Sequence, residues 1–322
     1  MTSLAQVTAL VDAHVRRDHA RFRAITLQIA AHVASRSERG ADQLRKLVDN
    51  QQAMTLVPLP IASGLLSAPS DLSTLDEMVL TPTVRDRIDR VVLEQSRRSD
   101  LFTHGLRPAR KLLFTGPPGV GKTMAAGALA RAIGMPMFRV ELHGVISQFL
   151  GETSSKLAKV FEHVRSMPAV YLFDEFDAIG AERSSLGNEA AGAEMRRVVS
   201  SLLQFVEDDR SDSLIVAATN HDQMLDSAVF RRFDEVVAFG SPTRDEVMVL
   251  VRRKLADIDA DQLDVGAIYS AVANPKLGHA DVCSALDRVR KDHVLVGTAI
   301  DTRSIVAAIV NRTRGNSTEV LS

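Results

Sequence analysis

Residues 111–123 read KLLFTGPPGVGKT, an apolar run that turns through glycines into the start of a helix-favouring segment. Gly116, four further residues, Gly121, Lys122 and Thr123 match the pattern of a phosphate-binding P-loop. Glycines let backbone N–H groups converge on an anion at a helix N-terminus, and the Lys122 ammonium adds a cation for the β- and γ-phosphates. The Thr123 hydroxyl can ligate Mg²⁺. This stretch therefore predicts a strand, a nucleotide-binding loop and a helix.

The alternative is a glycine-rich turn that binds no ligand. An apolar strand-like run before the loop and helix-favouring residues 124–133 after it supply the context that the motif requires, so we favour the nucleotide site. The expected nucleotide contacts are Gly116, Pro117, Pro118, Gly119, Val120, Gly121, Lys122, Thr123 and Met124.

Composition narrows the class of protein. The chain has 322 residues, which predicts two or three domains, and a net charge of −1, which gives no global attraction to nucleic acid. Its single cysteine, Cys283, excludes an internal disulfide. Charges interrupt the first thirty residues, and no window approaches 18 apolar residues, so we expect no secretory segment and no membrane span. Together these features predict a reducing, cytoplasmic location.

Periodicity divides the chain into four parts. Residues 1–50 carry apolar positions three and four apart and predict a small, mildly basic helical unit, either simply solvated or used to dock a partner. Residues 51–75 are rich in proline without a sustained period and predict a linker. Residues 76–241 alternate strands with helices, which predicts an α/β domain with a parallel sheet. Residues 242–322 hold four helical segments and predict a helical lid.

Two strand ends carry polar residues suited to phosphate chemistry. Asp174 and Glu175 follow the buried apolar run 169–173, and Asn220 follows the next strand. Asp174 is placed to hold the Mg²⁺ shell, whereas Glu175 can orient and deprotonate an attacking water, which favours hydrolysis over transfer to a second substrate. The alternatives are acids that merely end a strand and, for Asn220, a turn residue. The ordered set of four motif positions favours the catalytic interpretation.

The motifs GPPGVGKT, VYLFDEFDAIG, AATN and FRRFD, in that order, resemble those of AAA+ ATPases, and DEFDAIG together with GHAD resembles the narrower AAA clade of ring-forming remodellers. The resemblance covers about residues 76–312. It implies a five-stranded parallel sheet of order 5-1-4-3-2, an α-helical lid, and a ring, usually a hexamer, with ATP bound between neighbouring subunits. It also implies that Lys122 and Thr123 are the Walker A pair, Asp174 and Glu175 the Walker B pair, and Asn220 the sensor 1 residue.

Further roles follow from the resemblance alone. Arg231 and Arg232 fall where the clade has arginine fingers, which act on the nucleotide of the adjacent subunit. The clade usually spaces these arginines by two residues, whereas here they are adjacent; Arg232 matches the register to Phe233 better. The GHAD motif implies that Gly278 and Ala280 approach the adenine and ribose.

Phe149 and Leu150 fall where the family carries its first pore loop, and an aromatic–aliphatic pair can grip a polypeptide of any sequence. The alternative is a core phenylalanine at a helix start. The resemblance thus predicts an ATP-driven protein unfoldase that acts on protein substrates, with a separate protease or an adaptor docked on residues 1–50 as a candidate partner. A nucleic-acid-associated ATPase switch or loader is the alternative, disfavoured by the near-zero net charge and the absence of a basic helix-turn-helix.

Overall fold

The structure is a computed structural model in which two compact units, Met1–Ile61 and Ala62–Ser322, are distinguished. The expected helical unit of residues 1–50 and the pore residue Phe149 lie almost entirely outside the described part of the chain, and the four domain bounds given above stay predictions. The described residues are 8–9, 25–26, 28–29, 64–69, 72–145, 150–175, 200–221, 223, 227–256, 263–273 and 277–318.

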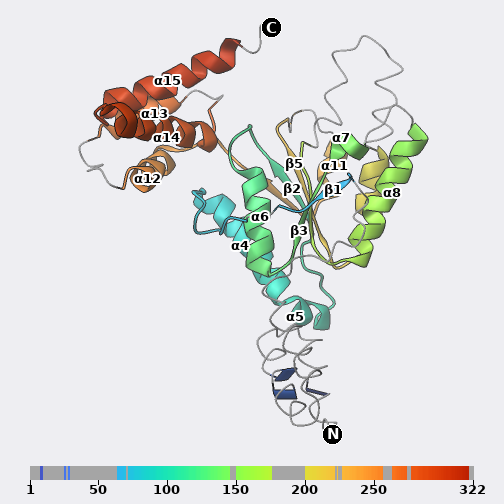
Figure 1. Cartoon of the computed structure of the whole chain (residues 1–322). Helices are drawn as coiled ribbons and strands as arrows, with labels where there is room; N and C mark the ends of the chain where they lie inside the picture. The colour runs from blue at the N-terminus through green and yellow to red at the C-terminus, as the bar shows by residue number, and fades with distance from the viewer. Residues whose placement is uncertain are drawn as a thin grey trace. The chain divides into compact units, whose positions relative to one another are not determined.

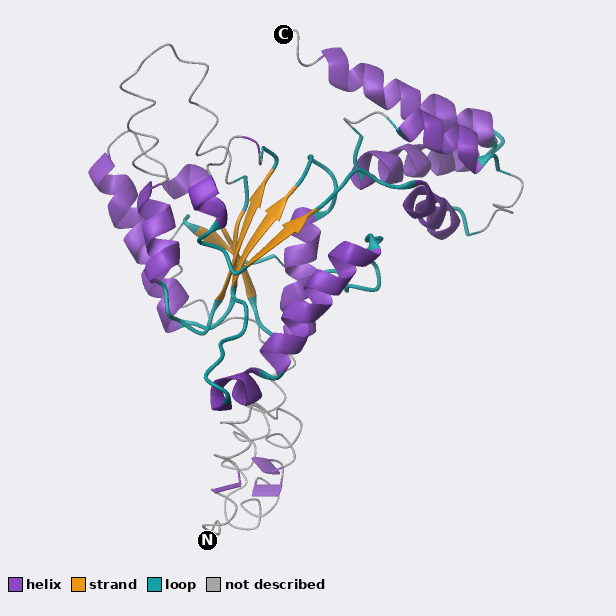
Figure 2. Ribbon diagram, turned by 180° about the vertical axis from the view of Figure 1, so that it is seen from behind, coloured by secondary structure: helices purple, strands orange, loops and turns teal. Residues whose placement is uncertain are grey.

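A six-stranded sheet forms the centre of the second unit, in the order β1-β3-β4-β5-β2-β6 (Figures 1 and 2). The last five strands along the chain pair in parallel and reproduce the predicted order 5-1-4-3-2, so the predicted α/β class is confirmed. The strands are β1 (Leu66–Ser67), β2 (Lys111–Thr115), β3 (Met137–Val140), β4 (Val170–Phe173), β5 (Leu214–Thr219) and β6 (Glu235–Ala238).

The sixth strand corrects the prediction of a five-stranded sheet. β1 comes from the stretch expected to be a linker and pairs antiparallel with β3, with Leu66 opposite Val140. The backbone N–H of Glu141 donates to the carbonyl oxygen of Leu65 at 2.9 Å, which extends this pairing. A two-residue strand is too short to show a period of alternation, so the pattern of the sequence could not indicate it.

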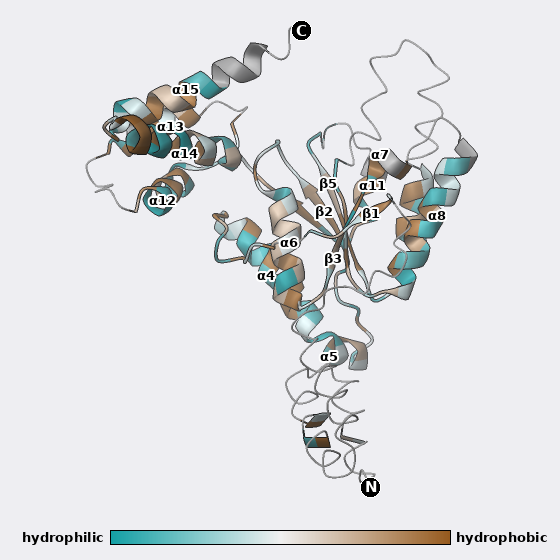
Figure 3. Cartoon of the chain, in the orientation of Figure 1, coloured by the Kyte–Doolittle hydropathy of each residue, from teal (hydrophilic) through white to brown (hydrophobic). Residues whose placement is uncertain are grey.

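Helices cover both faces of the sheet (Figure 1). α4 (Pro82–Ser96) and α6 (Lys122–Ile133) lie on one face, where Ile88 and Leu129 pack with Phe114 and Val216 of the strands. α8 (Leu150–Ser166) covers the other face, where the Phe161 ring stacks on Phe173 of β4 at 5.7 Å between centroids. Because both faces are buried, the strands are almost wholly hydrophobic, as Figure 3 shows.

Three short helices lie between these elements, α5 (Arg98–Thr103), α7 (Leu142–Val145) and α11 (Ser227–Phe230). After β6 the chain forms the helical lid, whose apolar side chains make a core of their own. A capping box between Thr243 and Glu246 starts its first helix, and Asp264 caps its second. The lid consists of α12 (Arg244–Lys254), α13 (Val265–Val272), α14 (His279–Val296) and α15 (Thr302–Thr318).

None of the helices within the described ranges combines the length and the apolar character needed to cross a membrane.

Candidate functional site

The loop between β2 and α6 can take its shape only with glycine at its turning points. Gly116 has φ 137°, and a Cβ there would lie 2.0 Å from the carbonyl oxygen of Phe239. Gly121 has φ 98° and caps the N-terminus of α6 in the left-handed region. The chain therefore turns tightly from strand to helix, so that the first N–H groups of α6 point into the loop, where an anion is favoured.

Lys122 connects this loop to the end of a second strand. Its side chain is buried, and Nζ donates to the carbonyl oxygens of Gly116 at 2.6 Å and Pro117 at 2.8 Å. Nζ also donates to Oδ1 of Asn220, directly after β5, at 2.8 Å. The three acceptors carry no net charge, so they orient the ammonium group without neutralising it. The expected P-loop lysine and sensor asparagine are thus brought together at the carboxyl ends of β2 and β5.

Thr123 and Asp174 form a pair of oxygen donors. The Thr123 hydroxyl donates to Oδ2 of Asp174 at 2.8 Å, which joins the start of α6 to the end of β4. Hydroxyl and carboxylate oxygens are ligands that Mg²⁺ prefers, so this pair fits the metal that the motif implies. Nη2 of Arg139, on β3, lies 3.3 Å from the same carboxylate oxygen. No motif pointed to Arg139, although a charged residue within an otherwise apolar strand was a signal.

Glu175 has an unusual backbone conformation. Its φ is 53°, the only positive value outside glycine among the described residues, and its N–H donates to Oδ1 of Asp174 at 3.0 Å. A residue with a β-carbon in this region stores backbone strain, and such strain concentrates at functional sites. The turn separates the exposed Glu175 side chain from the largely buried Asp174, as two distinct roles for the neighbouring acids require.

The helical lid meets the P-loop through the first turn of α14. The N–H of Ala280 donates to the carbonyl oxygen of Gly119 at 2.9 Å. A Cβ on Gly278 would lie 2.6 Å from the carbonyl oxygen of Pro118, so only glycine permits this approach. Asp281 accepts from the N–H of Gly278 at 3.0 Å and from Nε of Arg312 at 3.0 Å, which ties the helix start to α15.

His279, in the GHAD motif, has a side chain that is 15% exposed. Its Nε2 lies 3.6 Å from Oε1 of Glu246, whose carboxylate accepts from the N–H of Thr243 in the capping box of α12. Burial opposes ionisation of Glu246, but the nearby imidazole and hydrogen bonds from Thr243 outweigh it and hold the pKa of Glu246 below its usual value. The sequence patterns did not indicate this link between two lid helices.

Arg231 and Arg232 lie at the amino-terminal ends of the strands, whereas the P-loop lies at their carboxyl ends. They precede β6, and Asp234, which follows them, accepts hydrogen bonds from the backbone N–H groups of Arg110 and Lys111, each at 3.0 Å. Lys111 is the first residue of β2, whereas the P-loop follows its last residue. The structure therefore brings Lys122, Thr123, Asp174 and Asn220 together and leaves both arginines apart from them.

The pore pair is only partly described. Leu150 begins α8, and its side chain and all of Phe149 lie outside the described residues. Two further predicted nucleotide contacts, Val120 and Met124, differ in exposure: Val120 is buried in the core and Met124 is 41% exposed.

A P-loop at the carboxyl end of β2 in a parallel sheet, with an acid pair at the carboxyl end of β4 and a helical lid, defines a P-loop nucleotide-hydrolysing protein. A family model described as the ATPase family associated with various cellular activities (AAA) matches residues 112–241. An uncharacterised AAA family ATPase, y4kL of Sinorhizobium fredii, is 37% identical over 232 residues, which are 69% of this chain and 69% of that one. The chain therefore belongs to the AAA family of ATPases and is an enzyme that binds and hydrolyses ATP.

Two other similar proteins share a lower sequence identity with this chain. The peroxisomal ATPase PEX6 of Candida glabrata is 31% identical over 282 residues, which cover 78% of this chain but only 28% of that protein. The crystal structure of the FIGL-1 AAA domain superposes with a TM-score of 0.58 at 21% identity, covering 77% of this chain and 86% of that domain. At this identity the second likeness bears on the fold alone.

Proposed function

We propose that the chain assembles into a homo-oligomeric ring, a hexamer by family resemblance, and uses ATP hydrolysis to unfold or remodel protein substrates. The observation that carries this proposal is the position of Arg231 and Arg232. They lie beside the first residue of β2, and the two ends of this five-residue strand are about 13 Å apart at roughly 3.3 Å per residue. Arginines at this end of the strand lie apart from their own P-loop, so we infer that they serve the nucleotide of a neighbouring subunit.

The two arginines differ in their surroundings. Nε of Arg232 lies 3.4 Å from Oε2 of Glu207 in the same chain, and its side chain is 30% exposed. Arg231 is exposed. Although the register of the motif favoured Arg232, these contacts support Arg231 as the residue that reaches the neighbour and Arg232 as the residue that holds the turn through Glu207. The finger would balance charge on the phosphoryl group in the transition state.

Subunit mixing tests the shared site. Lys122→Ala and Arg231→Ala are each expected to lose hydrolysis alone, because one removes the P-loop cation and the other the neighbour's cation. Mixed in varied ratios, they should recover part of the activity, since some interfaces then combine an intact P-loop with an intact finger. Phosphate release measures the recovery. The double variant Lys122→Ala/Arg231→Ala mixed with Lys122→Ala is the control and should recover none.

Absence of recovery at every ratio would remove Arg231 from this role. Recovery with Arg232→Ala in place of Arg231→Ala, but not with Arg231→Ala, would assign the finger to Arg232 instead.

Within one subunit, the described residues support a division of labour. Mg²⁺ bound beside Thr123 and Asp174 would neutralise charge on the β- and γ-phosphates. Lys122 holds the phosphates, and Asn220, which accepts from Lys122, can orient the attacking water. Glu175 would take the proton from that water.

The second part of the proposal is that Phe149 and Leu150 grip an extended polypeptide in the centre of the ring. α8, which begins at Leu150, packs its Phe161 ring against Phe173, and Phe173 directly precedes Asp174. A shift at the acid pair can thus pass to α8 and to the pair at its start through one packed contact. A cytoplasmic location, and a protease or adaptor docked on residues 1–50, complete the proposal; they rest on the sequence patterns alone.

Replacing Phe149 by Ala tests the grip. We expect unfolded casein to stimulate ATP hydrolysis by the unchanged chain and to lose this stimulation with Phe149→Ala, because the aromatic ring makes the contact with the polypeptide. Phe149→Tyr, which keeps the ring, should retain stimulation. The measurement is the ratio of phosphate release with and without casein. Stimulation that persists in Phe149→Ala would remove Phe149 from this role.

A further inference from the structure

A second candidate binding site lies at the amino-terminal ends of β2 and β5, at the other end of these strands from the P-loop. It is a pocket of about 210 Å³ whose walls come from α4, α5, the residues before β2 and the residues before β5. Four of its nine lining residues are arginines and one is an aspartate, so we call it the arginine pocket. The lining residues are Gln95, Arg98, Phe102, Arg107, Pro108, Arg110, Arg210, Ser211 and Asp212.

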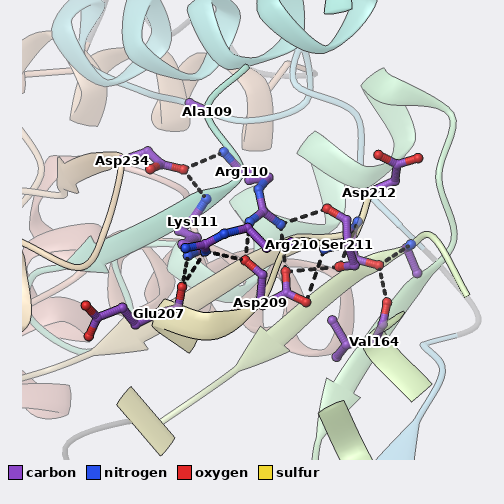
Figure 4. Close-up of polar contacts among 12 residues, drawn as sticks. Ala109, Arg110, Lys111, Val164, Glu207, Asp209, Arg210, Ser211, Asp212 and Asp234 are labelled. Atoms are coloured by element: carbon purple, nitrogen blue, oxygen red, sulfur yellow. Dashed lines mark hydrogen bonds and ion pairs between the residues drawn. The ribbon is translucent and has the colours of Figure 1, made fainter. Parts of the chain in front are cut away.

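Two of the four guanidinium groups already have a carboxylate partner. Arg110 pairs with the buried Asp209 at 2.6 Å, the central contact in Figure 4, and Arg98 pairs with Asp212 at the rim. These pairs fix the walls of the pocket. They also use the acids that could otherwise neutralise the other two arginines.

Arg107 and Arg210 keep their charge available. Both are exposed, and among the described residues Arg210 donates only to backbone carbonyl oxygens, those of Glu207 at 2.6 Å and Asp209 at 2.9 Å. Arg107 forms no ion pair with any residue in the described ranges. The pKa of the neighbouring Lys111 is lowered, first by burial and then by repulsion from Arg110 and Arg210, which is consistent with a positive charge around the pocket. The pocket therefore has an excess of positive charge in a chain whose net charge is −1.

Size and lining narrow the class of ligand. Pockets for drug-sized molecules measure roughly 300–1,000 Å³. The arginine pocket is smaller, so its volume suits a single side chain better than a whole nucleotide. A guanidinium matches a carboxylate in a bidentate geometry. Phe102, which is 49% exposed and lies 5.5 Å from the Arg98 guanidinium, offers an apolar surface for the methylene groups of a glutamate. A nucleic-acid backbone would call for an extended basic stripe and not a small concave site.

We propose that the arginine pocket binds an acidic side chain of a partner polypeptide, with Arg107 and Arg210 as its principal cationic contacts. The site is separate from the ATP site. An adaptor or substrate with an acidic segment would be held there, at the other end of β2 from the bound ATP.

Fluorescence anisotropy with the full chain tests this proposal. The probe is a fluorescein-labelled octaglutamate peptide in about 50 mM salt, below physiological ionic strength so that screening is weak. Its affinity should exceed that of the matched octaglutamine peptide by about tenfold or more, and Arg107→Glu should lower it by about tenfold, or about 1.4 kcal/mol. Arg210→Gln should lower it in the same direction. Arg107→Glu removes no ion pair between described residues, so an unchanged melting temperature is expected for this variant.

The matched control is Arg288→Glu, which reverses an exposed charge on α14 in the lid and should leave peptide binding unchanged. Equal binding of the two peptides, or equal weakening by Arg107→Glu and Arg288→Glu, would overturn the proposal. A labelled octathymidylate that binds more tightly than octaglutamate, and is lost in Arg107→Glu, would also overturn it by assigning the pocket to nucleic acid.

Discussion

Glu175→Gln is expected to bind ATP with nearly unchanged affinity and to hydrolyse it at least about a hundredfold more slowly, because general-base catalysis contributes roughly 10²–10⁴-fold. The amide keeps the shape of the side chain but cannot accept the proton of the attacking water. The contacts that we propose for the phosphates and the metal come from Lys122, Thr123 and Asp174, which the substitution leaves in place. Phosphate release at saturating Mg²⁺ and ATP measures turnover, and a fluorescent ATP analogue measures binding.

Glu162→Gln is the matched control, since Glu162 is an exposed acid on α8 away from the loop, and its substitution should leave both quantities unchanged. Unaltered turnover in Glu175→Gln would assign the base to another residue. Loss of binding together with turnover would mean that Glu175 holds the nucleotide or supports the strained turn at φ 53°. The distinction matters because a variant that binds ATP without hydrolysing it would keep its protein substrate bound, and that substrate could then be identified.

The centre of the fold could be predicted because its determinants are contiguous in sequence. The P-loop combines an apolar strand, glycines at fixed offsets and a helix start within residues 111–123, and each has a local physical cause. Parallel strands buried on both faces appear as short apolar runs, which placed five of the six strands. β1 escaped detection because two residues carry no periodicity and their pairing with β3 is a long-range contact.

At the candidate site, the sequence could not predict contacts between segments that lie far apart along the chain. The motifs named Asp174 but not Arg139, which lies 3.3 Å from its carboxylate, because only the pairing of β3 with β4 brings them together. Likewise, the resemblance implied a role for Gly278 at the nucleotide, whereas the structure adds a steric reason, its approach to the carbonyl oxygen of Pro118. The arginine pocket has no sequence motif, because its residues come from three separate stretches of chain.

Asp209→Ala is expected to lower the free energy of unfolding by about 3–5 kcal/mol, because it leaves a buried guanidinium without its counter-charge. The Asp209 side chain is fully buried, and its Arg110 partner is 13% exposed. Asp209 also accepts from the Ser211 hydroxyl at 3.0 Å (Figure 4). The pair anchors the residue before β2 to the residues before β5, so its loss loosens the two strands that carry the P-loop and Asn220.

The chain has no tryptophan, so urea unfolding is best followed by far-UV circular dichroism. Asp212→Ala is the matched control: it removes an aspartate three residues away that is 53% exposed, whereas Asp209 is fully buried, so it should lower the free energy of unfolding by less than Asp209→Ala does. Asp209→Asn, which keeps the shape but loses the charge, should fall between the two. Equal unfolding midpoints for Asp209→Ala and Asp212→Ala would mean that Arg110 finds water or another acceptor, and that burial of this pair does not stabilise the sheet.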